Sequence, residues 1–339
     1  MALLGSLFKR FTRARQPDLP CAPVSAPARP GAAPSRTPPA MAPAREAPGP
    51  GRDDVDRRFT ALLLGAGPLR RADADPAERR IIEQLAELAR SGRDSNLVPR
   101  LPAVLPRLIG LVRRDDVAPR ELAERLSRDP ALVGEVVRLA NSPRYRTGRD
   151  VADLQEAVIV LGQHGLIQLV TRAAMRPIFN AQQGRFSRIA GTRLWDLSDR
   201  CAHACAQLCG GADRFQAYLA GMVANAGLIV ALRVLDAGYQ ESRAPDSEDF
   251  HRALGDVTSM LSERIARHWN FHPDVCRAVG RRAGSRAGEA DDDLTRALRT
   301  ADRISKWHLL MPGLAVDALA GLTDAERGCY AELERTFGG

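Results

Sequence analysis

Aromatic side chains make up only 5% of this 339-residue sequence. Strands favour aromatic and β-branched residues, whereas Ala and Leu, which are abundant here, are strong helix formers. From Leu97 onward one apolar stripe of helical period follows another, and no segment alternates between apolar and polar residues. The sequence therefore predicts an all-α fold and argues against a sheet-based one.

Lysine is almost absent, since only Lys9 and Lys306 occur among 49 basic residues, and we attribute this bias to coding composition. The formal charge of +8 is uneven: residues 1–50 carry +5, and the other 289 residues hold 42 basic and 39 acidic side chains. The globular part thus lacks the broad basic surface that binds a phosphate backbone. Nucleic-acid binding is left as an alternative that depends on the N-terminal arm.

Segments that direct a chain to or through a membrane are also missing. The longest apolar stretch, Ala217–Leu232, is shorter than a bilayer span. The N-terminal apolar run precedes its positive charges, which is the reverse of a signal peptide. Six cysteines in a chain of this length then indicate reduced thiols without disulfides. We expect a cytoplasmic protein.

The N-terminal region differs in composition from the rest. Residues 17–50 contain 11 prolines and predict a disordered linker. Residues 1–16 place apolar residues at helical spacing among basic ones, which predicts either a short amphipathic helix or an unstructured start. Such a helix would contact a partner or, through residues 1–15, bind an anionic inner-membrane surface weakly.

The remaining chain divides into three predicted parts. Residues 51–94 form a helical N-terminal extension, residues 95–285 the main domain, and residues 286–339 an acidic loop with C-terminal helices. The expected helices are, in order, 53–64, 76–89, 103–113, 119–127, 130–140, 152–161, 164–178, 192–209, 213–234, 249–269, 273–280, and a helical section from 294 to about 337.

Several helix ends can be assigned from capping chemistry. Asp129 is a good N-cap, and Pro130 suits the first helical position, where its missing N–H costs nothing. Asn141 tolerates the left-handed conformation that often ends a helix, and Gly162 is expected to end the next helix in that conformation.

The order of these segments resembles the signature of the HDOD domain. The matching segments are Leu101–Val104, Asp129–Leu132, Leu139–Ser142, Ala157–Gly162, and Trp195 with Ser198. The resemblance implies an irregular multi-helix bundle found in bacterial regulatory proteins. It assigns a structural role to Pro102, Asp129, Pro130, Asn141, Ser142, Leu161, Gly162, Trp195, Ser198, Trp269 and Pro273.

The HDOD domain is related to the HD phosphohydrolases, whose ligand positions are replaced in this sequence. Gly221–Gly227 resembles the segment that carries the His-Asp pair of those enzymes, and it contains Ala224 and Asn225 instead. The position of a further ligand histidine in those enzymes corresponds to a residue near Thr258 here. The positions of a histidine pair correspond to residues near Arg281 and Arg282, where an extra residue makes the correspondence uncertain by one. The resemblance thus implies no metal, no cofactor and no catalysis, and two guanidinium groups would repel a cation.

Other clusters have simpler interpretations. His268 and His272 are four residues apart, but Pro273 follows them at once. No carboxylate or cysteine lies at a matching spacing, so we expect no metal there. A cysteine stripe at one helical face is expected to pack in the core rather than bind zinc: Cys201, Cys205 and Cys209. A glycine-bearing loop with Arg281, Arg282 and Arg286 is expected to be solvated, with anion binding as the alternative. Nucleophile, phosphate-loop and dinucleotide motifs are absent.

The sequence therefore predicts a non-catalytic signal-transduction module that binds signalling proteins or a small signal. The alternatives are a divergent metal-dependent phosphohydrolase and a nucleic-acid binder. The sequence names neither the partner nor the oligomeric state.

Overall fold

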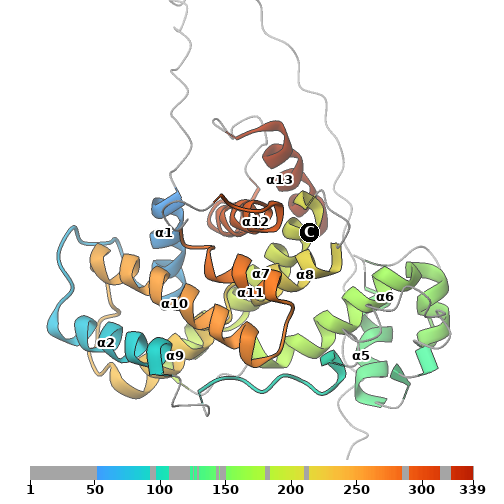
Figure 1. Cartoon of the computed structure of the whole chain (residues 1–339), viewed down its shortest axis with the longest axis horizontal. Helices are drawn as coiled ribbons and strands as arrows, with labels where there is room; N and C mark the ends of the chain where they lie inside the picture. The colour runs from blue at the N-terminus through green and yellow to red at the C-terminus, as the bar shows by residue number, and fades with distance from the viewer. Residues whose placement is uncertain are drawn as a thin grey trace, which may run out of the picture. The chain divides into compact units, whose positions relative to one another are not determined.

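Figure 1 shows the computed structural model of the chain, which divides into the units Met1–Arg45 and Glu46–Gly339. The structure describes residues 52–91, 97–106, 123–124, 126–127, 130–142, 145, 150–179, 184–209, 214–284, 290–313 and 322–338. The predicted amphipathic segment, the predicted linker and Asp129 lie outside these residues. All of the described residues belong to the second unit.

Helices account for all the regular elements of the described residues. They are α1 (Arg52–Leu64), α2 (Pro76–Ser91), α5 (Pro130–Ala140), α6 (Leu154–Phe179), α7 (Arg185–Leu208), α8 (Arg214–Val223), α9 (Gly227–Gly238), α10 (Glu248–His268), α11 (Pro273–Gly280), α12 (Asp293–Leu310) and α13 (Asp324–Phe337). Within these ranges the predicted all-α, multi-helix fold is confirmed.

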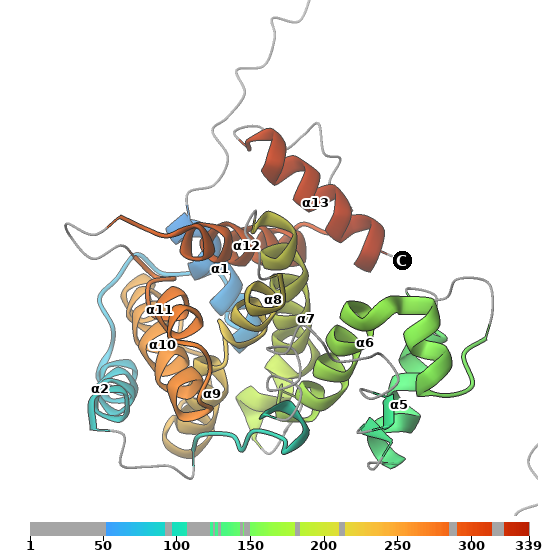
Figure 2. The ribbon, with the colours of Figure 1, turned by 45° about the vertical axis from the view of Figure 1, so that its right-hand side comes forward.

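Helix α7 lies at the centre of the bundle and packs against α8, α9 and α12, and also against α1, α6 and α13. Helices α2, α9, α10 and α11 form one side, α5 and α6 form a pair on the opposite side, and α12 and α13 cover the top (Figures 1 and 2). One apolar core runs through all of these helices. The irregular bundle thus buries α7 along most of its length.

Two glycines bend long helices. The predicted helices 152–161 and 164–178 are joined as α6, and the backbone turns at Gly162, where φ is 69°. The left-handed φ predicted for Gly162 is therefore confirmed. Helix α7 begins at Arg185, earlier than the predicted residue 192, because it continues through a kink at Gly191 with φ of 23°.

The predicted left-handed conformation of Asn141 is wrong, since Asn270 is the one described non-glycine residue with a positive φ. Asn141 uses its side chain instead. Its amide Nδ2 donates to the carbonyl of Val151 at 2.7 Å, and its Oδ1 accepts from the Val151 N–H at 2.8 Å. This paired bond ties the end of α5 to the segment before α6.

The single helix predicted over residues 213–234 is also wrong, because the chain breaks between α8 and α9. Residues 224–226 form a turn, in which the N–H of Ala226 bonds the carbonyl of Val223 at 3.0 Å. Gly227 explains the break: a Cβ there would lie 2.1 Å from the carbonyl of Thr258, and its N–H donates to Ser262 Oγ at 2.8 Å. Close contact with α10 fixes the start of α9.

The segment Arg214–Gly238, which comprises α8, this turn and α9, is long and apolar enough to cross a membrane by length and composition alone. Its most apolar window is 94% buried inside the structure. Core helices of globular proteins have the same composition, and the position of α8 and α9 beside α7 accounts for it.

Candidate functional site

A cluster of buried charges lies where α12 meets the end of α11. Asp302 of α12 accepts hydrogen bonds on Oδ2 from Arg282 Nη1 at 2.7 Å and from Lys306 Nζ at 2.6 Å. All three side chains are at most 5% exposed. Asp302 and Lys306 are one helical turn apart, so α12 presents both on the same face.

Helix α1 and the turn between α8 and α9 complete this buried charge cluster. Lys306 Nζ also donates to Asp56 Oδ1 of α1 at 2.6 Å. Asn225, in the turn between α8 and α9, donates from Nδ2 to Asp302 Oδ1 at 2.8 Å. Both Asp302 oxygens therefore accept, and the carboxylate binds two cations and one amide.

The electrostatics of the cluster follow from its burial. Burial by itself would raise the pKa of Asp302, but the charges of Arg282 and Lys306 and the Asn225 hydrogen bond outweigh it and hold that pKa well below its usual range. Burial would likewise lower the pKa of Arg282, and the charge of Asp302 reverses the effect and raises it. Asp302 and Arg282 are therefore charged at neutral pH.

A cavity of about 260 Å³ opens beside the cluster. Arg282, Lys306, Asn225 and Asp56 line it, together with polar groups of α1 and α10 that include Thr60, His251, Asp256 and Thr258. The described lining thus mixes acidic and basic groups.

His251 is fixed in the wall of this cavity. Its Nδ1 is 2.7 Å from Thr60 Oγ1 and its Nε2 is 3.0 Å from the carbonyl of Pro245. The Pro245 carbonyl only accepts, so Nε2 carries the proton and Nδ1 accepts from Thr60. Burial lowers the pKa of His251, which keeps the ring neutral.

The structure brings together some of the positions expected from the HD phosphohydrolases. Asn225, Thr258 and Arg282 line this one cavity. Ala224 is buried but does not line it, and the carbonyl of Arg281 accepts from Arg299 Nη2 at 3.0 Å. Asn225 and Arg282 reach the cavity from turns, whereas Thr258 reaches it from the middle of α10.

The predicted solvated loop is wrong at Arg282, which is 4% exposed and bonded to Asp302. Arg286 lies outside the described residues. The loop folds inward at Arg282 because Asp302 offers it a buried carboxylate.

The HDOD domain model matches residues 98–283 of the sequence. The chain belongs to the HDOD family. The match covers more than half of the sequence and includes α5 to α11, the turn with Asn225, and Arg282. It confirms the resemblance based on the sequence signature.

Solved structures share the HDOD fold at low identity. A provisionally named metal-dependent phosphohydrolase from Shewanella amazonensis SB2B is 20% identical, with a TM-score of 0.55 over 77% of this chain and 99% of that one. An HDOD domain protein of unknown function from Geobacter sulfurreducens is 21% identical, with a TM-score of 0.53 over 77% and 90%. A provisionally named signal transduction protein from Marinobacter aquaeolei VT8 is 19% identical, with a TM-score of 0.51 over 76% and 63%. No curated protein matches the sequence.

Most positions of the HDOD signature hold the bundle together. Trp269 donates from Nε1 to the carbonyl of Pro99 at 2.9 Å, and Pro273 occupies the first turn of α11. Trp195 packs on Phe179, with ring centroids 5.9 Å apart. The carbonyl of Pro102 accepts from the N–H of Leu105, and Ser142 Oγ donates to the carbonyl of Leu139. Leu161 packs against the core, Pro130 begins α5, and Ser198 is buried in α7.

The described part of this HDOD chain contains no group of three or more His, Cys, Asp or Glu side chains arranged to hold a metal ion. His268 is exposed, and His272 caps α11 by accepting from the N–H of Asp274 at 3.3 Å. Cys201 and Cys205 are fully buried, and burial raises the pKa of both thiols well above its ordinary value. The cysteine stripe therefore packs as core.

Asp56, Asp302 and Lys306 were not singled out by sequence reasoning. A signal for them does exist: Asp302 and Lys306 are four residues apart among the apolar residues Leu298, Ala301 and Ile304, and Lys306 is the one lysine after residue 9. A charged pair at that spacing within a buried stripe indicates a buried ion pair. The partners Arg282 and Asp56 are distant in sequence, and only the fold brings them together.

Proposed function

We propose that this HDOD protein is a non-catalytic signal-transduction protein, which acts in the cytoplasm by binding a protein partner or a small signal. The observation that supports the proposal is the carboxylate of Asp302, which is bound by Arg282, Lys306 and Asn225. An HD phosphohydrolase uses metal ions to lower the pKa of a bound water and so make a nucleophile. Here a guanidinium and an ammonium group occupy the side of the cavity where carboxylates would need to be free.

The energetics of metal binding oppose catalysis in this cavity. A divalent cation about 4 Å from one fixed positive charge is repelled by on the order of 8 kcal/mol at an effective dielectric constant of about 20. Arg282 and Lys306 both line the cavity and both repel such an ion. Asp302 and Asp56 carry the opposite charge, but both carboxylates are already ion-paired within the cluster. Asp56 cannot bind the ion freely, because it is bonded to Lys306 at 2.6 Å.

Metal-free general-base chemistry is also poorly served. A general base works best when its pKa lies near the operating pH. Asp302 has a strongly lowered pKa and both of its oxygens are bonded, while neutral His251 has both ring nitrogens engaged by Thr60 and Pro245. Asp302 and His251 thus support structure rather than proton transfer.

The proposal is tested on the full-length purified chain by elemental analysis and by turnover of bis(p-nitrophenyl) phosphate with added Mn²⁺, Mg²⁺ or Ni²⁺. We expect no stoichiometric transition metal and no turnover that depends on the cavity. The matched variants are Asp302→Asn and His251→Ala, which change this cavity, and Asp249→Asn on the exposed start of α10.

Two outcomes have different meanings. Turnover that is lost in Asp302→Asn or His251→Ala but kept in Asp249→Asn would overturn the proposal and support the divergent phosphohydrolase. Turnover that all three variants retain does not arise in this cavity. If it stays with the chain through a further purification step it overturns the proposal, and if it separates from the chain it comes from a contaminant.

A further inference from the structure

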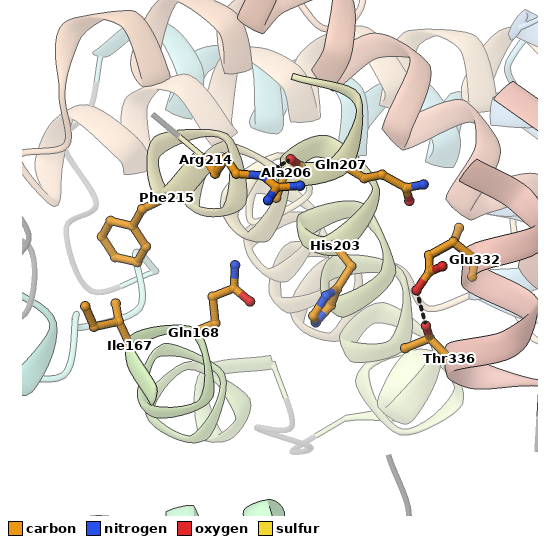
Figure 3. A pocket seen from close by; sticks show the side chains of 10 residues that line it. Ile167, Gln168, His203, Ala206, Gln207, Arg214, Phe215, Glu332 and Thr336 are labelled. Carbon is orange, nitrogen blue, oxygen red and sulfur yellow. Dashed lines mark hydrogen bonds between the residues drawn. The ribbon is translucent and has the colours of Figure 1, made fainter. Parts of the chain in front are cut away.

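A larger cavity lies between α6, α7, α8 and α13 (Figure 3). Its volume of about 630 Å³ falls within the range of about 300–1,000 Å³ that is typical of small-molecule sites. It shares no lining residue with the cavity beside the buried charge cluster. The first three helices belong to the matched HDOD region, whereas α13 follows it.

Apolar groups line much of this α13 cavity. Figure 3 shows Ile167 of α6 and Phe215 of α8 facing it from the same side. Leu333 of α13 and Ala206 of α7 add further apolar surface. Aromatic and aliphatic walls of this kind favour a ligand with a flat, apolar body, because burial of that body removes apolar surface from water.

Two side-chain amides point toward this space without a protein partner. Gln168 of α6 and Gln207 of α7 line the cavity, and neither amide hydrogen-bonds to another described residue. A primary amide both donates and accepts, so the pair suits a ligand with mixed hydrogen-bonding groups. His203 stands between them in Figure 3, and its ring is held edge-on by Tyr218, with centroids 5.4 Å apart.

The described lining of the cavity holds one arginine, Arg214, and one carboxylate, Glu332. Arg214 makes one weak contact, from Nε to the carbonyl of Ala206 at 3.5 Å, and forms no ion pair with a described carboxylate. The nearby carboxylate of Glu332 is already paired with Arg335. A guanidinium with free N–H groups at the edge of an apolar cavity prefers a carboxylate or a phosphate.

We propose that the α13 cavity binds a small organic anion. The flat body of the ligand lies against Ile167 and Phe215, its polar edge bonds Gln168 and Gln207, and its acidic group pairs with Arg214. A carboxylate and a phosphate ester share this chemistry. The inference rests on the proposed regulatory function only where it treats the ligand as a signal. Binding itself is measured directly, so its failure is distinct from the failure of the proposed function.

The signal would be transmitted through α13, which forms the outer wall of the cavity. Tyr330 of α13 donates to the carbonyl of Met311 at 2.8 Å, and Glu334 lies 2.8 Å from His308 Nε2. A ligand that touches both α13 and the HDOD domain binds only when α13 is docked, and so it stabilises the docked state by mass action. Binding is therefore expected to slow hydrogen exchange in α13.

The test is calorimetric titration of the full chain with 2-naphthoate and with adenosine monophosphate, each beside its neutral analogue, 2-naphthalenemethanol or adenosine. We expect at least one acid to bind with one equivalent per chain, and Arg214→Gln to weaken it about ten-fold or more, as loss of a charge-assisted hydrogen bond predicts. The matched control is Arg193→Gln, at an exposed position of α7, which should leave the affinity unchanged. Thr336→Trp, at the edge of the cavity, should block binding.

Binding of naphthoate alone identifies the source as a carboxylate, and binding of adenosine monophosphate alone identifies it as a phosphate ester. The inference is overturned if neither acid binds at about 10 mM, a limit near the weakest affinity of interest. It is also overturned if neutral analogues bind equally well or if Arg214→Gln binds like the parent chain. Circular dichroism of each variant separates a lost ligand from a lost fold.

Discussion

Replacing Asp302 by Ala should be among the most damaging single changes in the bundle. Asp302 is 1% exposed and is the shared partner of Arg282 at 2.7 Å and of Lys306 at 2.6 Å. Removal of one partner from a buried pair leaves an uncompensated charge and typically costs about 3–5 kcal/mol. Lys306 keeps Asp56, but Arg282 keeps no described carboxylate within ion-pair distance, so we expect the loss to fall in that range.

The assay is urea unfolding followed by far-ultraviolet circular dichroism, with the free energies compared at an unchanged dependence on urea. The control is Arg267→Ala, which removes an exposed pair with Glu263 whose arginine is 61% exposed; such pairs contribute about 0.2–1 kcal/mol. A loss in Asp302→Ala no larger than in Arg267→Ala would refute the description of a buried, charged cluster.

A second variant at the same position, Asp302→Asn, gives a pH signature. A carboxylate with a lowered folded-state pKa stabilises the protein above its unfolded pKa of about 3.9 and loses that contribution as the pH falls toward the folded-state value. The stability difference between the parent chain and Asp302→Asn should therefore be constant from neutral pH down to mildly acidic pH, and should shrink only below about 4. A difference that shrinks near pH 6 would contradict the direction of the pKa shift.

Three further outcomes follow from burial and contact. Gly227→Ala should lower the stability by about 1–3 kcal/mol or more, because the added Cβ would lie 2.1 Å from the carbonyl of Thr258. Gly255→Ala should stabilise the protein by about 0.4–1 kcal/mol, because a Cβ there meets no atom within 4 Å. Equal melting temperatures of the two variants would contradict this. Half-buried Cys209 should react with iodoacetamide in the native protein before the two buried cysteines of α7, and mass spectrometry would detect a wrong order. Glu78→Gln should destabilise the protein by about 1–3 kcal/mol, because its carboxylate accepts from Ser247 Oγ and from backbone N–H groups; an unchanged urea midpoint would contradict this.

Local patterns in the sequence were sufficient for the helices. The stripes and caps of residues 130–140, 249–269 and 273–280 predict α5, α10 and α11 to within a residue, since each helix is delimited by its own Pro, Ser or Asn. Gly162 was interpreted correctly because a left-handed turn requires a residue without a Cβ. These features depend on neighbours along the chain.

The break between α8 and α9 could not be predicted from such local patterns. Residues 213–234 carry an uninterrupted apolar pattern, so the sequence predicts one helix. The interruption comes from α10, where the Thr258 carbonyl and Ser262 approach Gly227. A tertiary contact of this kind leaves no periodicity in the segment that it bends.

The sequence predicted part of the candidate site. The replaced positions Asn225, Thr258 and Arg282 follow from the order of the family segments, and they do line one cavity. The role of Arg282 was missed because its partner Asp302 lies 20 residues further along the chain, beyond the matched region. An ion pair between separate helices is a property of the packed bundle.

The buried charge cluster also has a consequence for how the protein depends on its surroundings. Metal ions at the centre of an enzyme are exchangeable, and their occupancy rises and falls with supply and with chelators. Arg282 and Lys306 provide positive charge that is covalently part of the chain and cannot be withdrawn. Under the proposed function, the bundle responds to its ligands and partners while the centre of its fold stays indifferent to the metal content of the cell.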